Sequence, residues 1–286
     1  MIRWFFEPVP LGRVAALRTL AYLFVPLDVL VLTPWVLDHK DVPGELYQPL
    51  LIGRVLHLPT PSYWLVVGVA VALLGCALVA ATGRAPRLLG IAVFVLYFEW
   101  MIVAMSYGKV DHDRVGYLVL LAVLPTIGKA RWGDAETLSE KAGWAMRVTQ
   151  IAVVCTYFLA AWAKLRFGGV EWVNGATLTR AVLRRGTFLS DWTVQVPFLL
   201  VGFQWFIMTF ELASPVVLFL RNERVRTLVI LAFYGFHVMV YATITIAFWP
   251  HLVAMASFLP LERVRPVVWV RTRLQRRAQL SGPRSP

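Results

Sequence analysis

The sequence is short of charged residues and of cysteine, and both shortages exclude classes of protein. Only 15% of its 286 residues are charged, whereas 59% are hydrophobic, a balance far more apolar than that of a soluble globular domain. Its two cysteines, Cys76 and Cys155, both fall inside apolar runs, so they predict neither a disulfide framework nor a metal site. The composition therefore indicates a polytopic membrane protein.

Motifs of the common enzyme classes are missing as well. The sequence has no HExxH zinc motif, no GxSxG nucleophile elbow, no GKT or GKS phosphate loop and no haem or iron–sulfur cysteine spacing. None of its five histidines has metal-ligand spacing, so no metal is expected. Paired interrupted repeats, which are typical of transporters, do not occur either, and transport ranks last among the possible functions.

Acidic residues are scarce, with 16 against 28 lysines and arginines. The net charge of +12 would suit a nucleic-acid partner, but the basic residues stand between the apolar runs and in the arginine-rich stretch 263–286. Such stretches beside a span are typical of the cytoplasmic side, where anionic headgroups attract them. We therefore expect membrane lipids as partners, no nucleic acid, and a basic cytoplasmic tail over 263–286.

What the sequence has instead is a series of apolar runs, and a transmembrane helix needs about 20 such residues. Backbone groups must be satisfied within lipid and nothing alternates like a barrel strand, so the spans are expected to be helical. The predicted fold is all-α, a polytopic transmembrane bundle of about eight helices in one domain over 1–262. The runs are 11–32, 62–81, 88–107, 114–127, 145–164, 194–220, 225–246 and 249–261, of which the fourth and eighth are short.

Because the arginine-rich tail is expected to be cytoplasmic, an even number of spans puts the N-terminus of this multi-pass cell-membrane protein on the cytoplasmic side too. The long connections 34–61 and 165–193 then lie outside. Connections of this length are either functional or plain surface segments, so both interpretations stay open: a cap over an outward-opening cavity, or simple links between spans.

Polar residues recur seven positions apart in the apolar runs, a spacing that returns nearly to the same face of a helix. Three such seams predict a wet or ligand-holding cavity between helices. Their members are Gln150, Tyr157 and Lys164 in the fifth run, Gln204 and Glu211 in the sixth, and Tyr234, His237 and Tyr241, which lie along one face of the seventh.

Lys164 closes the fifth run, where an ionisable residue is costly unless it lines a cavity or reaches the interface. Removal from water disfavours the ammonium, so a neutral amine can act as a base. The alternative is a lysine that snorkels to the interface.

Glu211 and His237 also have two interpretations each. Pro215 removes a backbone hydrogen bond to the carbonyl of Glu211, which predicts a kink and a free acceptor beside the carboxyl group. Glu211 then shapes a site or only fixes packing. His237 suits a carbonyl or phenol oxygen, or cements two helices with a hydrogen bond. Arg18, Asp28 and Glu99 are expected to form structural ion pairs, with Arg18 to Glu99 as one option.

Several segments, in order, resemble the horizontally transferred transmembrane (HTTM) domain, the membrane domain of vitamin K-dependent gamma-carboxylase and its bacterial relatives. They are an arginine in the first run, DHDR, YFLAAWAKL, EWVNGATL, ELASP and FHVMVYATITIAFWPHLVAMASFLP, and the resemblance covers roughly residues 2–261. The carboxylase continues into a large lumenal region, whereas here a basic tail follows, so carboxylation of protein glutamates does not carry over as an expectation. The expectation that does follow from the resemblance is a membrane cavity with a lysine base for a quinone or another lipid-soluble substrate.

The resemblance implies roles for particular residues. Lys164 matches the lysine thought to deprotonate vitamin K hydroquinone, His112 matches a histidine tied to epoxidation, and His237 matches one near the quinone site. We therefore predict Lys164 and His112 as catalytic, Tyr157, Trp172, Glu211 and His237 as substrate- or quinone-binding, and reduced vitamin K or another quinol as cofactor. The competing hypothesis is a non-enzymatic membrane protein, a small-molecule binder or an assembly subunit, whose charges only hold helices together.

Overall fold

The structure is a computed structural model that describes residues 2–264. Of the tail predicted at 263–286, all but the first two residues lie outside this part. Within it the chain is helical, which confirms the all-α fold, apart from one two-residue ladder in which Val9–Pro10 (β1) pairs antiparallel with Leu138–Ser139 (β2).

Six of the helices are long and apolar enough to cross a membrane. They are α2 (Leu11–Leu27, continued by the π turn Asp28–Leu32), α4 (Tyr63–Ala81), α5 (Leu88–Met105), α7 (Glu140–Gly168), α9 (Pro197–Ala213, continued by the 3-10 turn Ser214–Phe219) and α10 (Glu223–Ile244). These match six of the predicted runs closely. The chain is thus a multi-pass membrane protein.

The fourth and eighth predicted runs form shorter helices, α6 (Val115–Ile127) and α11 (Trp249–Met255). At 1.5 Å per residue, 13 residues of α6 extend only about 20 Å, less than the hydrocarbon thickness. The predicted number of about eight spans is therefore not confirmed. The remaining short helices are α1 (Ile2–Phe5), α3 (Leu51–Val55) and α8 (Ala176–Arg185), with 3-10 turns at Pro34–Asp41, Gly44–Leu46, His112–Arg114, Val170–Val173, Asp191–Gln195, Ala256–Phe258 and Leu261–Arg263.

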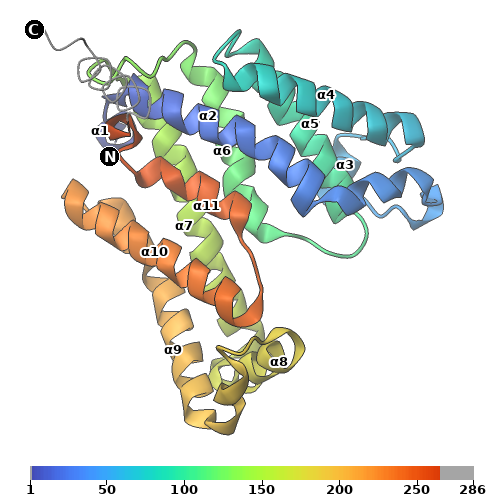
Figure 1. Ribbon diagram of the computed structural model, residues 1–286, viewed down its shortest axis with the longest axis vertical. Coiled ribbons are helices and arrows are strands. Elements are labelled where there is room, and N and C mark those ends of the chain that lie inside the picture. The colour runs from blue at the N-terminus through green and yellow to red at the C-terminus, as the bar shows by residue number, and fades with distance from the viewer. Residues whose placement is uncertain (1, 265–286) are drawn as a thin grey trace, which may run out of the picture.

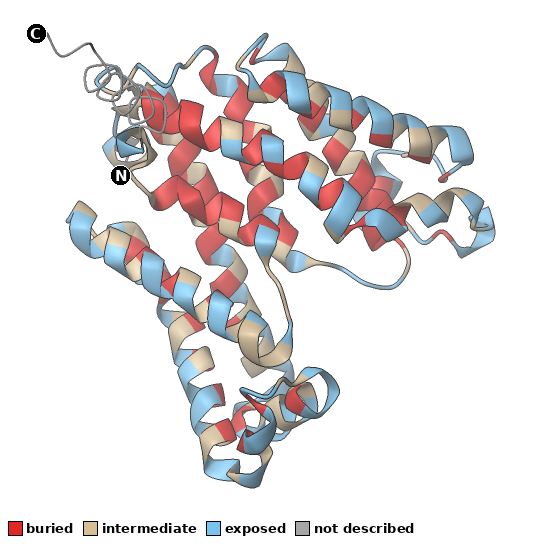
Figure 2. Ribbon diagram, in the orientation of Figure 1, coloured by how far each residue is buried: buried red, intermediate tan, exposed pale blue. Residues whose placement is uncertain are grey.

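The long helices form two arms that diverge from a common end (Figure 1). One arm contains α2, α4 and α5, the other α7, α9 and α10, and α6 and α11 lie between them. Buried residues concentrate where α2, α6, α7 and α11 meet, whereas α9 and α10 expose most of their length (Figure 2). The exposed side chains of α10 are largely apolar, as expected for a surface that faces lipid.

A buried ion pair fixes the turn His112–Arg114 to the end of α2. Arg114 Nη1 donates to both carboxylate oxygens of Asp28, at 2.8 and 2.6 Å, and the Tyr97 hydroxyl donates to Asp28 at 2.8 Å. Arg18 does not pair with Glu99, because its Nη2 instead donates to a backbone carbonyl of the connection after α6 at 2.7 Å. The pairing of Arg18 with Glu99 was thus a wrong prediction, whereas Asp28 does find a partner on another element.

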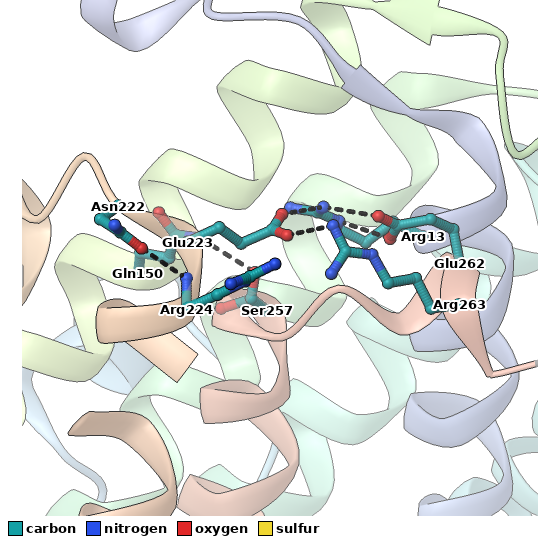
Figure 3. Close-up of polar contacts among 8 residues, drawn as sticks. All are labelled: Arg13, Gln150, Asn222, Glu223, Arg224, Ser257, Glu262 and Arg263. Carbon is teal, nitrogen blue, oxygen red and sulfur yellow. Dashed lines mark hydrogen bonds and ion pairs between the residues drawn. The ribbon is translucent and has the colours of Figure 1, made fainter. Parts of the chain in front are cut away.

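A second cluster of charges joins the end of the described chain to its first span (Figure 3). The Arg13 guanidinium donates to both carboxylate oxygens of Glu262 at 2.8 Å and to Glu223 at 3.3 Å. Arg263 also pairs with Glu223. Since Glu223 begins α10, this cluster ties α2, α10 and the turn Leu261–Arg263 together at the common end of the arms.

Candidate functional site

A cavity of about 690 Å³ lies between α7, α8, α9, α10, α11 and the turn His112–Arg114. Its walls are mostly apolar, and drug-sized or cofactor-sized ligands occupy pockets of this volume. All six residues predicted from the sequence line it: His112, Tyr157, Lys164, Trp172, Glu211 and His237. The structure brings them together from five separate elements, while their chemical roles stay predictions.

Lys164 and Glu211 form an ion pair within the cavity wall. Lys164 Nζ lies 2.7 and 2.5 Å from the two carboxylate oxygens of Glu211, and 5.0 Å from the centre of the Trp172 ring. The amine of Lys164 thus points at a carboxylate and an aromatic ring of the cavity wall. An ammonium between a carboxylate and an aromatic face is stabilised by both.

The predicted free carbonyl at Glu211 is wrong. Its backbone oxygen accepts a hydrogen bond from the N–H of Ser214, because α9 gives way there to a 3-10 turn. Pro215 sits in the first positions of that turn, where its missing N–H costs nothing. The proline therefore reshapes the helix end without leaving an acceptor for a ligand.

The opposite polar pair of the cavity joins α7 to α10. The Tyr157 hydroxyl lies 2.5 Å from Nε2 of His237, so His237 both lines the cavity and links two helices. If the hydroxyl donates to Nε2, the neutral imidazole carries its own proton on Nδ1. That atom is buried and has no hydrogen-bond partner among the described residues. A buried donor without an acceptor is costly.

Among the wall residues that sequence reasoning did not assign to the site are His251 and Asp113. His251 is 1% exposed, its ring meets the Tyr157 ring edge-on at 4.7 Å, and neither ring nitrogen has a partner within the described chain. No spacing signal linked it to His237, because α11 follows a break in the helix.

Burial raises the pKa of the Asp113 carboxyl, although Arg114 opposes this effect. Asp113 belongs to the DHDR motif, but nothing in the sequence indicated a role for it apart from that of His112.

Four of the eight residues in the predicted seams, Gln150, Gln204, Tyr234 and Tyr241, do not line the cavity, and three of these four form hydrogen bonds to backbone carbonyls. Gln150 Nε2 donates to the Ser257 carbonyl at 2.9 Å, Gln204 to the carbonyl of Trp172, and the Tyr234 hydroxyl to the carbonyl of Leu252 at 2.7 Å. These side chains hold helices and turns together and do not line the cavity. Of the two long connections, 165–193 contributes part of the wall and 34–61 contributes none. The cap interpretation therefore fits only the second connection.

Within residues 2–264, no group of three or more histidine, cysteine, aspartate or glutamate side chains is placed to bind a metal ion. No family model, no curated protein and no solved structure matches the chain.

Proposed function

We propose that this membrane protein is an enzyme of the HTTM type that deprotonates a quinol or a related lipid-soluble phenol in its cavity, with Lys164 as the base. The observation that carries the proposal is the Lys164–Glu211 pair in a mostly apolar cavity beside the Trp172 ring. The resemblance of YFLAAWAKL and its neighbouring motifs to the HTTM domain adds the substrate class. Reduced vitamin K or another quinol is the proposed cofactor.

The pair supplies both the base and a way to activate it. An ammonium proton passes from Lys164 to the carboxylate of Glu211, 2.5 Å away, and leaves a neutral amine and a neutral carboxyl group. The amine then takes the phenolic proton of the quinol and becomes an ammonium again. The phenolate that forms is stabilised by this ammonium at close range. The pair has gained one proton and the substrate has lost one, so charge and protons balance.

The other polar residues suit the second oxygen of a quinol. The two hydroxyl groups of a hydroquinone lie at opposite ends of one ring, and the cavity has a second polar group at Tyr157 and His237. Nδ1 of His237 can donate to a phenol or quinone oxygen. Aromatic side chains such as Phe236 and Phe248 line the wall between apolar residues and favour a flat ring. His112, also in the wall, is the proposed second catalytic residue.

The test is consumption of quinol and of dissolved oxygen by the purified protein in mild detergent, with oxygen as the oxidant of the phenolate and Lys164→Arg as the matched variant. Arginine keeps the positive charge and the pair with Glu211 but does not give up its proton, so turnover should fall to background while thermal stability stays near that of the unmodified protein. Full activity of Lys164→Arg, or an unmodified protein that neither binds nor consumes any quinol, would rule out the base mechanism.

A second candidate function has its own support in the same pair. An ion pair between Glu211 and Lys164 joins α9 to α7, as a purely structural contact would. In that case the protein is a small-molecule binder or an assembly subunit without catalysis. Quinol binding that survives in Lys164→Arg, with no turnover by any form of the protein, would favour this function.

We propose the cell membrane as the location, with both termini cytoplasmic. The support is the arginine-rich stretch 263–286. A reporter fused after Pro286 should score as cytoplasmic, and a single cysteine introduced in 165–193 should react with an impermeant reagent from outside. A fused reporter that scores as external would overturn this orientation.

A further inference from the structure

Residues 166–192, which comprise the last three residues of α7, helix α8 and the turns on both sides of α8, lie at the tip of one arm of the molecule (Figure 1). We call this stretch the α8 segment. Three membrane-spanning helices begin or end beside it: α7 ends at Gly168, α9 begins at Pro197 and α10 ends at Ile244. The ends of spans lie at the membrane surface. The α8 segment therefore lies in the interface between water and hydrocarbon.

Helix α8 has two different faces. One face supplies Thr177, Leu178 and Ala181 to the wall of the cavity. Arg180 and Leu183 lie on the other side of the helix, and Arg184 lies at the edge of the cavity face; all three are exposed. Arginine and leucine exposed together near the ends of spans suit a membrane interface, where the guanidinium reaches the headgroups and the leucine reaches the acyl chains.

Large apolar side chains of the segment project away from the protein. Phe167 is 83% exposed, Leu183 73% and Phe188 84%. The turn that carries Phe188 is not a loose loop, because Thr187 Oγ1 donates to the Ala242 carbonyl at 2.7 Å and Thr187 N to the Thr243 carbonyl at 3.2 Å. Exposed aromatic groups on an anchored turn indicate a surface made for contact.

The same surface is basic. The segment contains four basic residues, Arg166, Arg180, Arg184 and Arg185, but only two acidic ones, Glu171 and Asp191. None of the four arginines forms an ion pair with a carboxylate in the described part of the chain. Guanidinium groups bind phosphate through two parallel hydrogen bonds, and basic residues near an anionic bilayer are attracted to it.

We propose that the α8 segment docks onto a bilayer surface rich in anionic phospholipid. Phe167, Leu183 and Phe188 insert at the boundary of headgroups and acyl chains, and the arginines bind the phosphate groups. Because α8 is also a wall of the cavity, docking holds the cavity against the leaflet from which a lipid-soluble substrate enters. Only this last consequence rests on the proposed function.

The test places an environment-sensitive fluorophore on the segment. Cys76 and Cys155 are replaced by alanine, and Leu189→Cys provides one labelling site next to Phe188, which stays in place. The labelled protein is reconstituted in vesicles of phosphatidylcholine alone or of phosphatidylcholine with phosphatidylglycerol. We expect emission at shorter wavelength, and at least twofold weaker quenching by aqueous iodide, in the anionic vesicles.

Two charge-matched variants decide whether the arginines cause this difference. Arg184→Gln with Arg185→Gln should abolish it, whereas Arg221→Gln with Arg224→Gln, which removes the same charge before and within the first turn of α10, should leave it intact. Equal quenching in the two kinds of vesicle, or an equal loss in both variants, would overturn the proposal. No quinol is present in this assay, so a failure of docking and a failure of quinol turnover are observed separately.

Discussion

Tyr157 of α7 and His237 of α10 are linked across the cavity by a hydrogen bond of 2.5 Å between the hydroxyl and Nε2. The bond is one of the contacts that hold α10 to α7, and His237 is one of the three residues of α10 that are buried, with Ile230 and Phe233.

Tyr157→Phe should therefore destabilise the fold. The substitution leaves Nε2 of a buried histidine without a partner, which costs about 1–3 kcal/mol. The double variant Tyr157→Phe with His237→Leu should recover much of the loss, because replacing both partners by apolar groups is nearly neutral. The measurement is thermal unfolding in mild detergent for the two single variants and the double variant. Losses that simply add would show that the two side chains do not act together.

The Lys164–Glu211 pair predicts different outcomes for two substitutions of one residue. Lys164→Ala leaves the carboxylate of Glu211 in the cavity wall without its cation, so stability should fall by about 2–4 kcal/mol, whereas Lys164→Arg should cost less than about 1 kcal/mol. From the sequence alone, an interface lysine would add little stability. Glu211→Gln should reduce quinol turnover about 100-fold, because it removes the carboxylate that receives the ammonium proton. Equal unfolding temperatures for Lys164→Ala and Lys164→Arg would contradict the ion pair.

The candidate site shows what a sequence can and cannot disclose. Lys164 and Glu211 stood out because charges are rare within apolar runs. Gln150 and Gln204 have the same seven-residue spacing, yet both donate to nearby backbone carbonyls, and spacing cannot separate a packing hydrogen bond from a ligand contact. His251 faces the cavity only because α11 folds back against α7, a tertiary contact with no periodic signal.

The sequence predicted the long membrane-spanning helices well and the short helices poorly. The six long helices agree with hydropathy because about 20 residues must be apolar to span lipid. The short α6 and α11 are surrounded by other helices, so burial in protein and not in lipid explains their apolar sequence. Hydropathy does not distinguish these two environments.

The buried pair of Asp28 and Arg114 should be among the most sensitive contacts. Asp28→Asn leaves a buried guanidinium without its carboxylate, and breaking such a pair costs about 3–5 kcal/mol. The exposed pair of Lys40 and Asp41 is the control, and Asp41→Asn should cost less than about 1 kcal/mol. Unfolding temperatures of the two variants provide the comparison. The turn with His112 should also lose its position, so Asp28→Asn should lower quinol turnover further than its stability explains.

Two glycines on membrane helices should respond in opposite directions to alanine. A Cβ at Gly143 of α7 would collide with the backbone carbonyl of Glu7, so Gly143→Ala should destabilise the protein by about 1–3 kcal/mol. At Gly75 of α4 a Cβ meets nothing within 4 Å, and Gly75→Ala should stabilise it by up to about 1 kcal/mol, because alanine favours the helix. Thermal unfolding of both variants in one detergent is the measurement. A stabilised Gly143→Ala variant would show that α1 and β1 do not pack on α7 as described.

The cluster at the common end of the arms predicts acid sensitivity. Burial would raise the pKa of Glu262, but its hydrogen bonds to Arg13 and the charge of that arginine outweigh burial and hold the pKa below the usual 4.5. The unfolded chain therefore binds a proton at this group more readily than the folded one, so the stability that Glu262 contributes is complete above its ordinary pKa and is lost as pH falls through the lower folded value.

Between pH 7 and pH 3 the unfolding temperature of Glu262→Gln should start lower and fall less steeply than that of the unmodified protein. Arg13→Gln should flatten the curve in the same way, because it removes the cause of the shift. Parallel curves for all three proteins would show that the pairing of Arg13 with Glu262 does not hold α2 to the end of the chain.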